Sequence, residues 1–141
     1  MPITDSEKAR RSALLEAHYD AENSHDMDGI MATFSPDCEI FLNRVPFTDP
    51  QSIRYVHSSI GFSDAGAFEG IHNYIDAKHF TEDEVIVEGR FCAKHVGDFE
   101  GIEATGRNVE MPFVAFYRFD DADKLVSERI VMNLGVLVAS G

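Results

Sequence analysis

The feature that most constrains this 141-residue chain is a change in the period of its apolar residues near Asn73. Before that point apolar side chains recur every three to four residues, as on one face of a helix. After it they alternate with polar side chains, as on a half-buried strand. Helices followed by strands with short turns are typical of an α+β domain. The sequence therefore predicts a single α+β domain over residues 1–141.

The first half of the chain carries signals for helix starts. Thr4 and Glu7 have the spacing of a capping box, in which a hydroxyl and a carboxylate cap the first turn. Asp26 can cap a second, short helix, and Asp49 followed by Pro50 favours the start of a third. We expect helices at about residues 5–21, 27–34 and 50–60, with a strand at 38–42 between the last two.

The second half is expected to form four strands, at residues 74–80, 84–95, 107–119 and 125–138. Short polar turns separate them, so consecutive strands should pair as an antiparallel meander. The glycine-containing connection at 61–70 is expected to form a flap over a pocket. The residues of the second strand that should share the core face are Val85, Val87, Gly89, Phe91, Ala93 and His95.

The charge of the chain excludes several classes of partner. It contains 25 acidic and 12 basic residues, a net charge of −13, and such a surface repels nucleic-acid phosphates and anionic membranes. The N-terminal residues lack the pattern of a signal peptide, and no apolar run is long enough to span a bilayer. We expect a cytoplasmic protein with no nucleic-acid partner and no membrane partner.

Local motifs predict neither a metal site nor a cofactor. The six histidines form no H-x-H or HExxH pattern, and Cys38 and Cys92 lack CxxC spacing, so the cysteines are interpreted as free thiols. Gly97 and Gly106 lack the strand–GxGxxG–helix context of a phosphate-binding loop.

Three sequence elements occur, in the same order and at similar spacing, in one known family. Residues 94–99, Lys-His-Val-Gly-Asp-Phe, followed by Ala-Thr-Gly-Arg at 104–107, are similar to that family's T-H-x-G-E-F and P-T-G-[KR] elements. Residues 23–40 resemble its helix-to-strand passage, and Lys124 to Val126 with Glu128 resemble its G-K-I-x-E turn. Over nearly its whole length the chain resembles the SnoaL-like polyketide cyclase branch of the nuclear-transport-factor-like, or ketosteroid-isomerase-like, superfamily.

This resemblance implies both a fold and a class of ligand. The fold is a cone-shaped α+β barrel, with N-terminal helices packed in a curved, mostly antiparallel sheet around an internal cavity. The ligand is a small, mostly apolar, carbonyl-bearing molecule, polyketide-like or steroid-like. Cofactor-free acid/base chemistry of a cyclase, isomerase or lyase is implied, but the same fold also serves in noncatalytic ligand-binding or dimerisation modules. Both classes stay open at this point, since a fold alone does not determine function.

A homodimer is also expected. The second face of the long strands would leave an unusually large apolar patch in solvent if it were not covered. The sheet-to-sheet pairing usual for the fold would cover it. The residues assigned to that face are Val114, Phe116, Val126, Ile130, Met132 and Leu134.

Two residues are candidates for catalysis. Strand alternation places His95 on the cavity wall, where it would act as a general acid or base; the alternative is a core histidine bonded to the backbone. The resemblance places the family's acid/base aspartate at Asn133, and an amide cannot exchange a proton at neutral pH. We expect Asn133 to orient the ligand and any proton transfer to depend on His95.

Five further residues are candidates for ligand binding. His18 shares the packed face of the first helix, with a structural role as its alternative. Asp76 either lines the cavity or forms an outer ion pair with Lys78. The aromatic candidates, which belong to a mainly core set, are Phe91, Phe113 and Tyr117.

Overall fold

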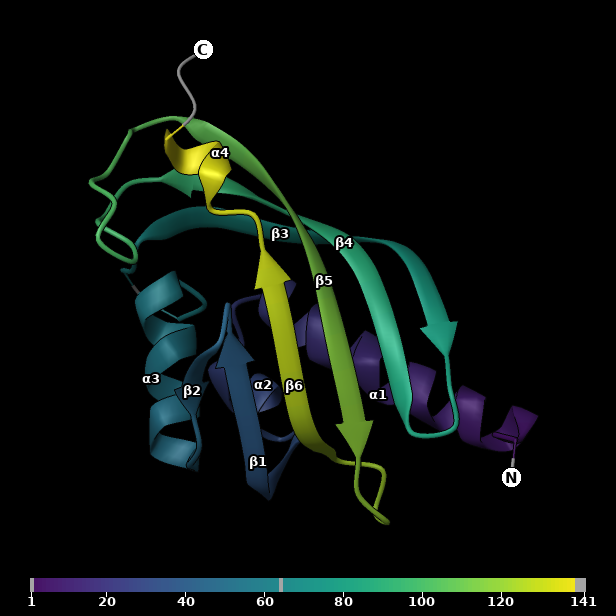
Figure 1. Cartoon of the computed structure of the whole chain (residues 1–141). Helices are drawn as coiled ribbons and strands as arrows, with labels where there is room; N and C mark the ends of the chain where they lie inside the picture. The colour runs from purple at the N-terminus through teal and green to yellow at the C-terminus, as the bar shows by residue number, and fades with distance from the viewer. Residues whose placement is uncertain (1, 64, 139–141) are drawn as a thin grey trace.

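A curved sheet of six strands wraps around two helices, and its concave face forms most of the core (Figure 1). The computed structural model describes residues 2–63 and 65–138. The elements in chain order are α1 (Asp5–Asn23), α2 (Met27–Met31), β1 (Phe34–Leu42), β2 (Val45–Phe47), α3 (Pro50–Ile60), β3 (Phe68–Phe80), β4 (Glu84–His95), β5 (Asn108–Phe119), β6 (Leu125–Met132) and α4 (Gly135–Val138).

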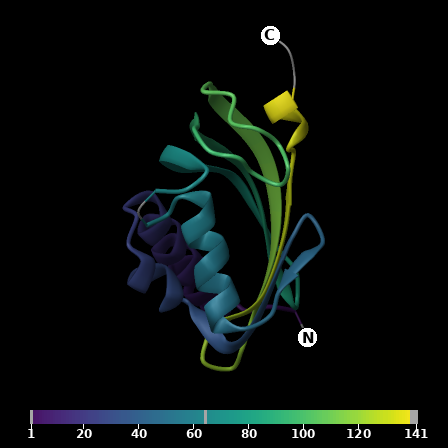
Figure 2. The ribbon, with the colours of Figure 1, turned by 90° about the vertical axis from the view of Figure 1, so that its left-hand side faces the viewer.

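The strands are ordered β2-β1-β6-β5-β4-β3, and every neighbouring pair is antiparallel except β1 and β6, which are parallel. Seen from the side, α1 and α3 lie on the concave side of the sheet (Figure 2). The predicted α+β fold, with N-terminal helices against a curved and mostly antiparallel sheet, is confirmed. The sheet is not closed into a complete barrel, because β2 and β3 remain as its edges.

The helix starts follow the predicted capping chemistry. Thr4 Oγ1 accepts a hydrogen bond from the Glu7 amide at 3.1 Å, and Glu7 Oε2 accepts one from the Thr4 amide at 2.8 Å. At α3, Asp49 Oδ1 accepts from the Ser52 amide at 2.8 Å, and Pro50 occupies the first turn. These local bonds satisfy amides that have no partner within the helix.

Several elements differ from the predicted ones. α2 ends at Met31 rather than residue 34, and β1 begins at Phe34 rather than Cys38. β3 begins at Phe68 rather than Tyr74, because its first residues pair with the far end of β4 at His95. β2 was not predicted, and it pairs with β1 across a tight turn. β6 ends at Met132 instead of continuing to residue 138, since Asn133 Oδ1 accepts from the Gly135 amide at 3.0 Å and starts a short helix. No helix among the described residues is long and apolar enough to cross a membrane.

The assignment of faces on β6 is corrected. Ile130 and Met132, expected on the outer face, pair with Ala115 and Phe113, and cross-strand partners share one face. Ala115 and Phe113 are buried, so Ile130 and Met132 point to the concave side with them. The cause is an extra residue at Val126, where β6 bulges against Arg118 and Phe119 of β5. A bulge of this kind reverses the alternation of the side chains that follow it.

The outer face of β5 and β6 is therefore smaller than expected. It retains Val114 and Phe116, which are half-buried, and Val131, which is 59% exposed and pairs with Val114. The Arg129 guanidinium lies 5.1 Å from the centre of the Phe116 ring and covers part of it. We propose that a second copy of the chain covers this face.

Light scattering at micromolar concentration should then give a mass of twice the chain mass of 15.7 kDa. Val131→Asp should shift the protein to the monomer, because a charge would be buried against apolar side chains. Val96→Asp, at another exposed valine, is the matched control and should stay dimeric. A wild-type protein that is only monomeric would contradict the proposal.

Candidate functional site

A small cavity lies between α1, α3 and the concave face of the sheet. Its volume is about 50 Å³, and most of its wall is apolar. Polar atoms enter it from α1, α3, β3, β5 and β6. The residues that line it are Tyr19, Glu22, Ile40, Leu42, Val56, His57, Ile60, Phe62, Asn73, Phe91, Phe113, Tyr117, Glu128, Ile130 and Met132.

The buried face of α1 is unusually polar for a helix that packs against a core. Its buried residues include Leu15 and Tyr19, which are four residues apart, and His18 and Glu22, which are also four residues apart. A carboxylate in such a position requires partners, because an isolated buried charge is costly. Asn73 on β3 supplies one, since its Nδ2 donates to Glu22 Oε1 at 3.0 Å.

The second oxygen of Glu22 meets two imidazoles. His18 Nε2, one helical turn away, and His57 Nε2, from α3, each lie 3.3 Å from Glu22 Oε2. His18 Nε2 has no well-directed hydrogen bond, so its contact with the carboxylate is chiefly electrostatic. On the other side of the rings, His18 Nδ1 lies 2.9 Å from Thr33 Oγ1, and His57 Nδ1 lies 2.8 Å from the Ile53 carbonyl oxygen.

This cluster keeps Glu22 ionised. Burial alone raises the pKa of Glu22, but the charges and hydrogen bonds of His18 and His57 outweigh burial and lower it to about 2. For His18, burial lowers the pKa, while the carboxylates of Glu22 and Glu128 raise it by more, so the net shift is upward. The carboxylate of Glu22 thus serves as a fixed negative charge at the cavity wall.

A second carboxylate enters the cavity from β6 with a different set of neighbours. Glu128 Oε1 accepts a hydrogen bond from the Tyr117 hydroxyl at 3.4 Å, and Glu128 Oε2 is buried without a partner. Tyr117 is also bonded to the Tyr19 hydroxyl. Because Tyr117 has one proton and gives it to Glu128, Tyr19 is the donor to Tyr117.

The environment of Glu128 favours its protonated form. Burial is the largest cause and raises its pKa; the nearby charge of Glu22 raises it further, against a smaller lowering by His18 and His57. Burial also raises the pKa values of Tyr19 and Tyr117 well above the usual 10, so both remain hydrogen-bond donors. A carboxyl whose pKa is raised by burial is suited to exchange a proton with a bound ligand.

The aromatic candidates Phe91, Phe113 and Tyr117 line the cavity. His18 is buried but does not belong to the lining; it lies behind the cavity wall, against Glu22 and the rings of Tyr19 and Tyr117. Their roles in ligand binding stay predictions.

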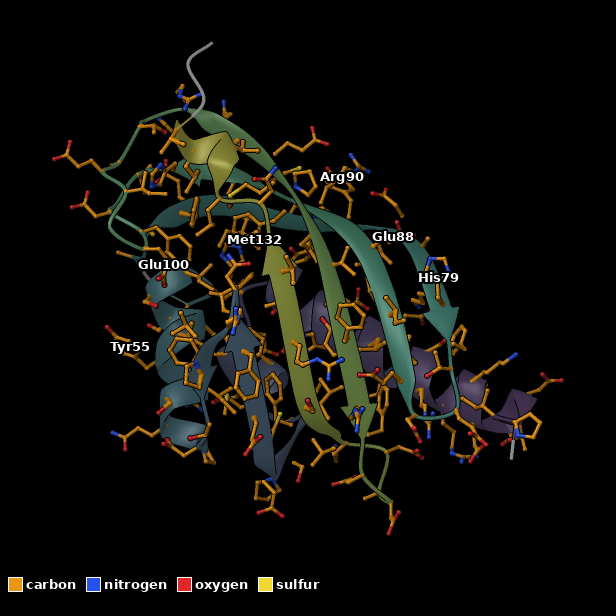
Figure 3. All side chains as sticks on the ribbon, in the orientation of Figure 1. Tyr55, His79, Glu88, Arg90, Glu100 and Met132 are labelled. Atoms are coloured by element: carbon orange, nitrogen blue, oxygen red, sulfur yellow. The ribbon has the colours of Figure 1, made fainter. Side chains whose placement is uncertain are left out.

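Asp76 does not line the cavity. It is the extra residue of a bulge between Ile75 and Ala77, and it points to the outer face, where Arg90 Nε and Nη2 each lie 3.0 Å from one of its oxygens. Lys78, the expected partner, contacts Glu16 of α1 instead. Figure 3 labels Arg90 on β4, beside the exposed pair formed by His79 and Glu88.

His95 faces the core as predicted, but it lies beyond the cavity and is not among the residues that line it. Its Nδ1 accepts a hydrogen bond from the Thr105 amide at 3.2 Å, and its ring stacks on Phe68 with the centres 5.1 Å apart. The expected place on the cavity wall is therefore corrected. The cause is the length of β4, which carries its last inward residue past the helices to the 97–106 connection.

Asn133 also lies outside the cavity. β6 has ended at Met132, and the exposed Asn133 side chain caps the turn into α4 (Figure 3 labels the adjacent Met132). The assignment of the family's acid position to Asn133 depended on an uninterrupted final strand, and that strand stops one residue earlier.

The polar residues that the sequence reading missed are Glu22, His57 and Glu128. Each carried a local signal. Glu22 and His57 fall at helical spacing from apolar residues of α1 and α3, and Glu128 alternates with Ile130 and Met132. A charged side chain in an apolar stripe is the informative exception to the pattern.

Comparison with known proteins agrees with the geometry. The profile of the SnoaL-like domain family matches residues 15–128. AclR of Streptomyces galilaeus, a proposed hydroxylase, is 26% identical, with 92% of this chain and 79% of that chain covered and a TM-score of 0.75. No curated protein matches the sequence significantly.

Two further solved structures share the fold at lower identity. A proposed SnoaL-like polyketide cyclase from Jannaschia sp. CCS1 has a TM-score of 0.80 at 15% identity, with 94% of each chain covered. IdmH of Streptomyces antibioticus, a proposed polyketide cyclase, has a TM-score of 0.72 at 21% identity, with 91% of this chain and 95% of that chain covered.

The raised pKa of Glu128 makes a prediction about stability. Above about pH 4.5, the usual value, the unfolded chain loses this proton while the folded chain keeps it, so stability falls as pH rises toward the folded pKa. The Glu128→Gln variant has no carboxyl at this position, so its stability does not fall in this way. The variant should match the wild type near pH 4 and be more stable at pH 8, as measured by urea unfolding at both values. An advantage that is the same at both pH values would contradict the raised pKa.

A second prediction concerns the hydrogen bond that the Thr105 amide donates to His95 Nδ1. His95→Leu replaces the imidazole with an apolar side chain of similar size and leaves the Thr105 amide without its acceptor. This loss should lower the unfolding free energy by about 1–3 kcal/mol. His79→Leu, at an exposed histidine, is the control and should change stability by less than about 0.5 kcal/mol. Equal stability of His95→Leu and wild type would show that this contact is not structural.

Proposed function

Because the chain belongs to the SnoaL-like domain family, we propose that its cavity binds a small, mostly apolar, carbonyl-bearing molecule on which Glu128 transfers a proton. The observation that carries this proposal is the unpartnered Glu128 Oε2, buried in a cavity whose wall is otherwise mainly apolar. A buried oxygen without a partner is rare and calls for a functional explanation.

The reaction class follows from the chemistry of the polar groups. A carboxylate at Glu128 can remove a proton from a carbon next to a carbonyl, and the resulting carboxyl can return it at another atom. Once Glu128 has taken up the proton, Tyr117 no longer has to donate to it, so the Tyr117 hydroxyl can turn to the enolate oxygen that develops while Tyr19 continues to donate to Tyr117. Cyclisation, isomerisation and elimination each begin with such a step.

The size of the cavity limits how a ligand enters. Its volume of about 50 Å³ holds a few water molecules, whereas pockets for drug-sized ligands measure roughly 300–1,000 Å³. Ligand entry therefore requires side chains to move. Met132, with three rotatable bonds, and Ile60 at the end of α3 form part of the wall and can be displaced without breaking a hydrogen bond.

The alternative is a noncatalytic binding module with the same cavity. The two differ in what Glu128 does: in a module it is at most a hydrogen-bonding group, and in an enzyme it exchanges a proton with the ligand. One experiment on a single probe separates them.

The probe is 2-tetralone, a bicyclic ketone with acidic α-hydrogens. We expect the protein to accelerate deuterium exchange at its α-carbon in D₂O, followed by NMR in the presence of EDTA. Glu128→Gln should lower the rate by about 100- to 10,000-fold, the usual contribution of a general base. Glu110→Gln, on the outer face of β5, is the matched control and should exchange at the wild-type rate.

Two results would contradict the proposal. Exchange that survives Glu128→Gln but is lost in Asn133→Ala would assign the proton transfer to the final turn instead. Shifts of the Ile130 and Met132 methyl signals on adding 2-tetralone, without any catalysed exchange, would favour the binding module.

A further inference from the structure

The hydrogens of the two buried histidines can be assigned from their partners. His57 Nδ1 lies 2.8 Å from the Ile53 carbonyl oxygen, which only accepts, so Nδ1 carries a hydrogen. Thr33 Oγ1 lies 2.7 Å from the Ile30 carbonyl oxygen and must give its one proton there. It therefore accepts from His18 Nδ1 at 2.9 Å, which also carries a hydrogen.

This assignment leaves three acceptors facing one another. A neutral ring that is protonated at Nδ1 has a lone pair at Nε2, and both Nε2 atoms lie 3.3 Å from Glu22 Oε2. All three groups are buried, and the Phe34 ring packs on both imidazoles. Such a group of lone pairs needs a cation among its members. Two arrangements meet this need: a proton on each Nε2, which makes both rings cationic, or one metal ion that accepts all three lone pairs.

We propose that His18 Nε2, His57 Nε2 and Glu22 Oε2 bind one divalent transition-metal ion, of which Zn²⁺ is the best fit. The three atoms lie within 4.8 Å of one another. They form the buried group of potential metal ligands found among the described residues. Two imidazole nitrogens and one carboxylate oxygen, without sulfur, suit Zn²⁺ and its neighbours and do not suit Mg²⁺ or Ca²⁺, which prefer oxygen.

The distances agree with coordination. With metal–ligand bonds of about 2.1 Å, a separation of 3.3 Å between ligand atoms corresponds to an angle of about 105° at the metal, close to tetrahedral. Both Glu22–histidine separations have this value. The site therefore needs little rearrangement on the two edges that share the carboxylate oxygen.

The outer contacts are those that a metal site requires. Metal-binding histidines donate their other N–H to a fixed acceptor, as His18 does to Thr33 and His57 does to Ile53. The second oxygen of Glu22 is held by the Asn73 amide at 3.0 Å, which sets the rotation of the carboxylate. Each ligand is thus oriented before a metal arrives.

The fourth position of the metal would face the cavity. Glu22 and His57 belong to the cavity wall, while His18 lies behind them. Three protein ligands with one open position are typical of catalytic rather than structural zinc sites. A carbonyl oxygen or a water molecule in the cavity would take that position.

The inference goes beyond the proposed function and does not depend on it. Proton exchange by Glu128 is measured in EDTA, so its presence or absence is independent of metal binding. Metal binding, in turn, can be measured in Glu128→Gln, which keeps all three ligands.

The test is a titration of the metal-stripped full chain with Co²⁺, followed by visible absorption. We expect one Co²⁺ per chain, with the intense bands of a four- or five-coordinate ion, and displacement by Zn²⁺ confirmed by metal analysis. His57→Gln should weaken Co²⁺ binding by more than about 100-fold, because losing an outer contact alone costs 10- to 100-fold. Thr33→Val, which removes the acceptor of His18 Nδ1 and the hydrogen bond to Ile30 but none of the three ligands, should weaken it by about 10- to 100-fold.

His79→Gln is the matched control. The substitution removes an exposed histidine whose Nε2 lies 2.7 Å from Glu88 Oε2. The variant should bind Co²⁺ as the wild type does. Should His57→Gln fail to fold, the wild-type titration and Thr33→Val decide the question. The proposal is overturned if the wild type shows no stoichiometric bands, which would mean that protons alone occupy the cluster. It is also overturned if His79→Gln weakens binding as much as His57→Gln.

Discussion

One buried carboxylate connects the parts of this molecule that have to meet for a cavity to exist. Glu22 projects from α1 and contacts His18 of the same helix, His57 of α3 and Asn73 of β3. Breaking a buried ionic cluster by removing one partner costs about 3–5 kcal/mol, since the remaining charge is left unpaired. The position of both helices on the concave face of the sheet therefore depends on this side chain as well as on apolar packing.

The two carboxylates of the cavity have opposite pKa shifts, and their partners explain the difference. Glu22 has two imidazoles and an amide, which keep it ionised with a pKa of about 2. Glu128 has one tyrosine hydroxyl and an oxygen without a partner, so burial dominates and its pKa is raised. Environments that shift the pKa values of two acids in opposite directions in this way assign the two acids different roles. Glu22 is suited to hold cations, and Glu128 is suited to exchange protons.

The bulges of the sheet determine which side chains reach the cavity. Without the extra residue at Val126, Glu128 would lie on the outer face with Ser127 and Arg129 on the inner one. A bulge at Asp76 similarly places Lys78 on the inner side, against Glu16 of α1, whereas Asp76 stays on the outer face with Arg90. Side chains alternate between the two faces of a strand with a period of two residues, so one inserted residue exchanges the inward-facing and outward-facing side chains. The inward position of Glu128 thus depends on one local irregularity of strand pairing in β6.

The sequence by itself determined the α+β class, the capped helix starts and the inward face of β4, because these depend on neighbours a few residues apart. It also named Phe91, Phe113 and Tyr117, which line the cavity, as aromatic candidates for ligand contact. Only the tertiary structure decided that His57 meets Glu22, that Asn133 leaves the sheet and that Glu128 faces inward. Those outcomes depend on how α3 crosses the sheet and where strands bulge or end. Local periodicity contains no information on distances between segments that are far apart in the chain.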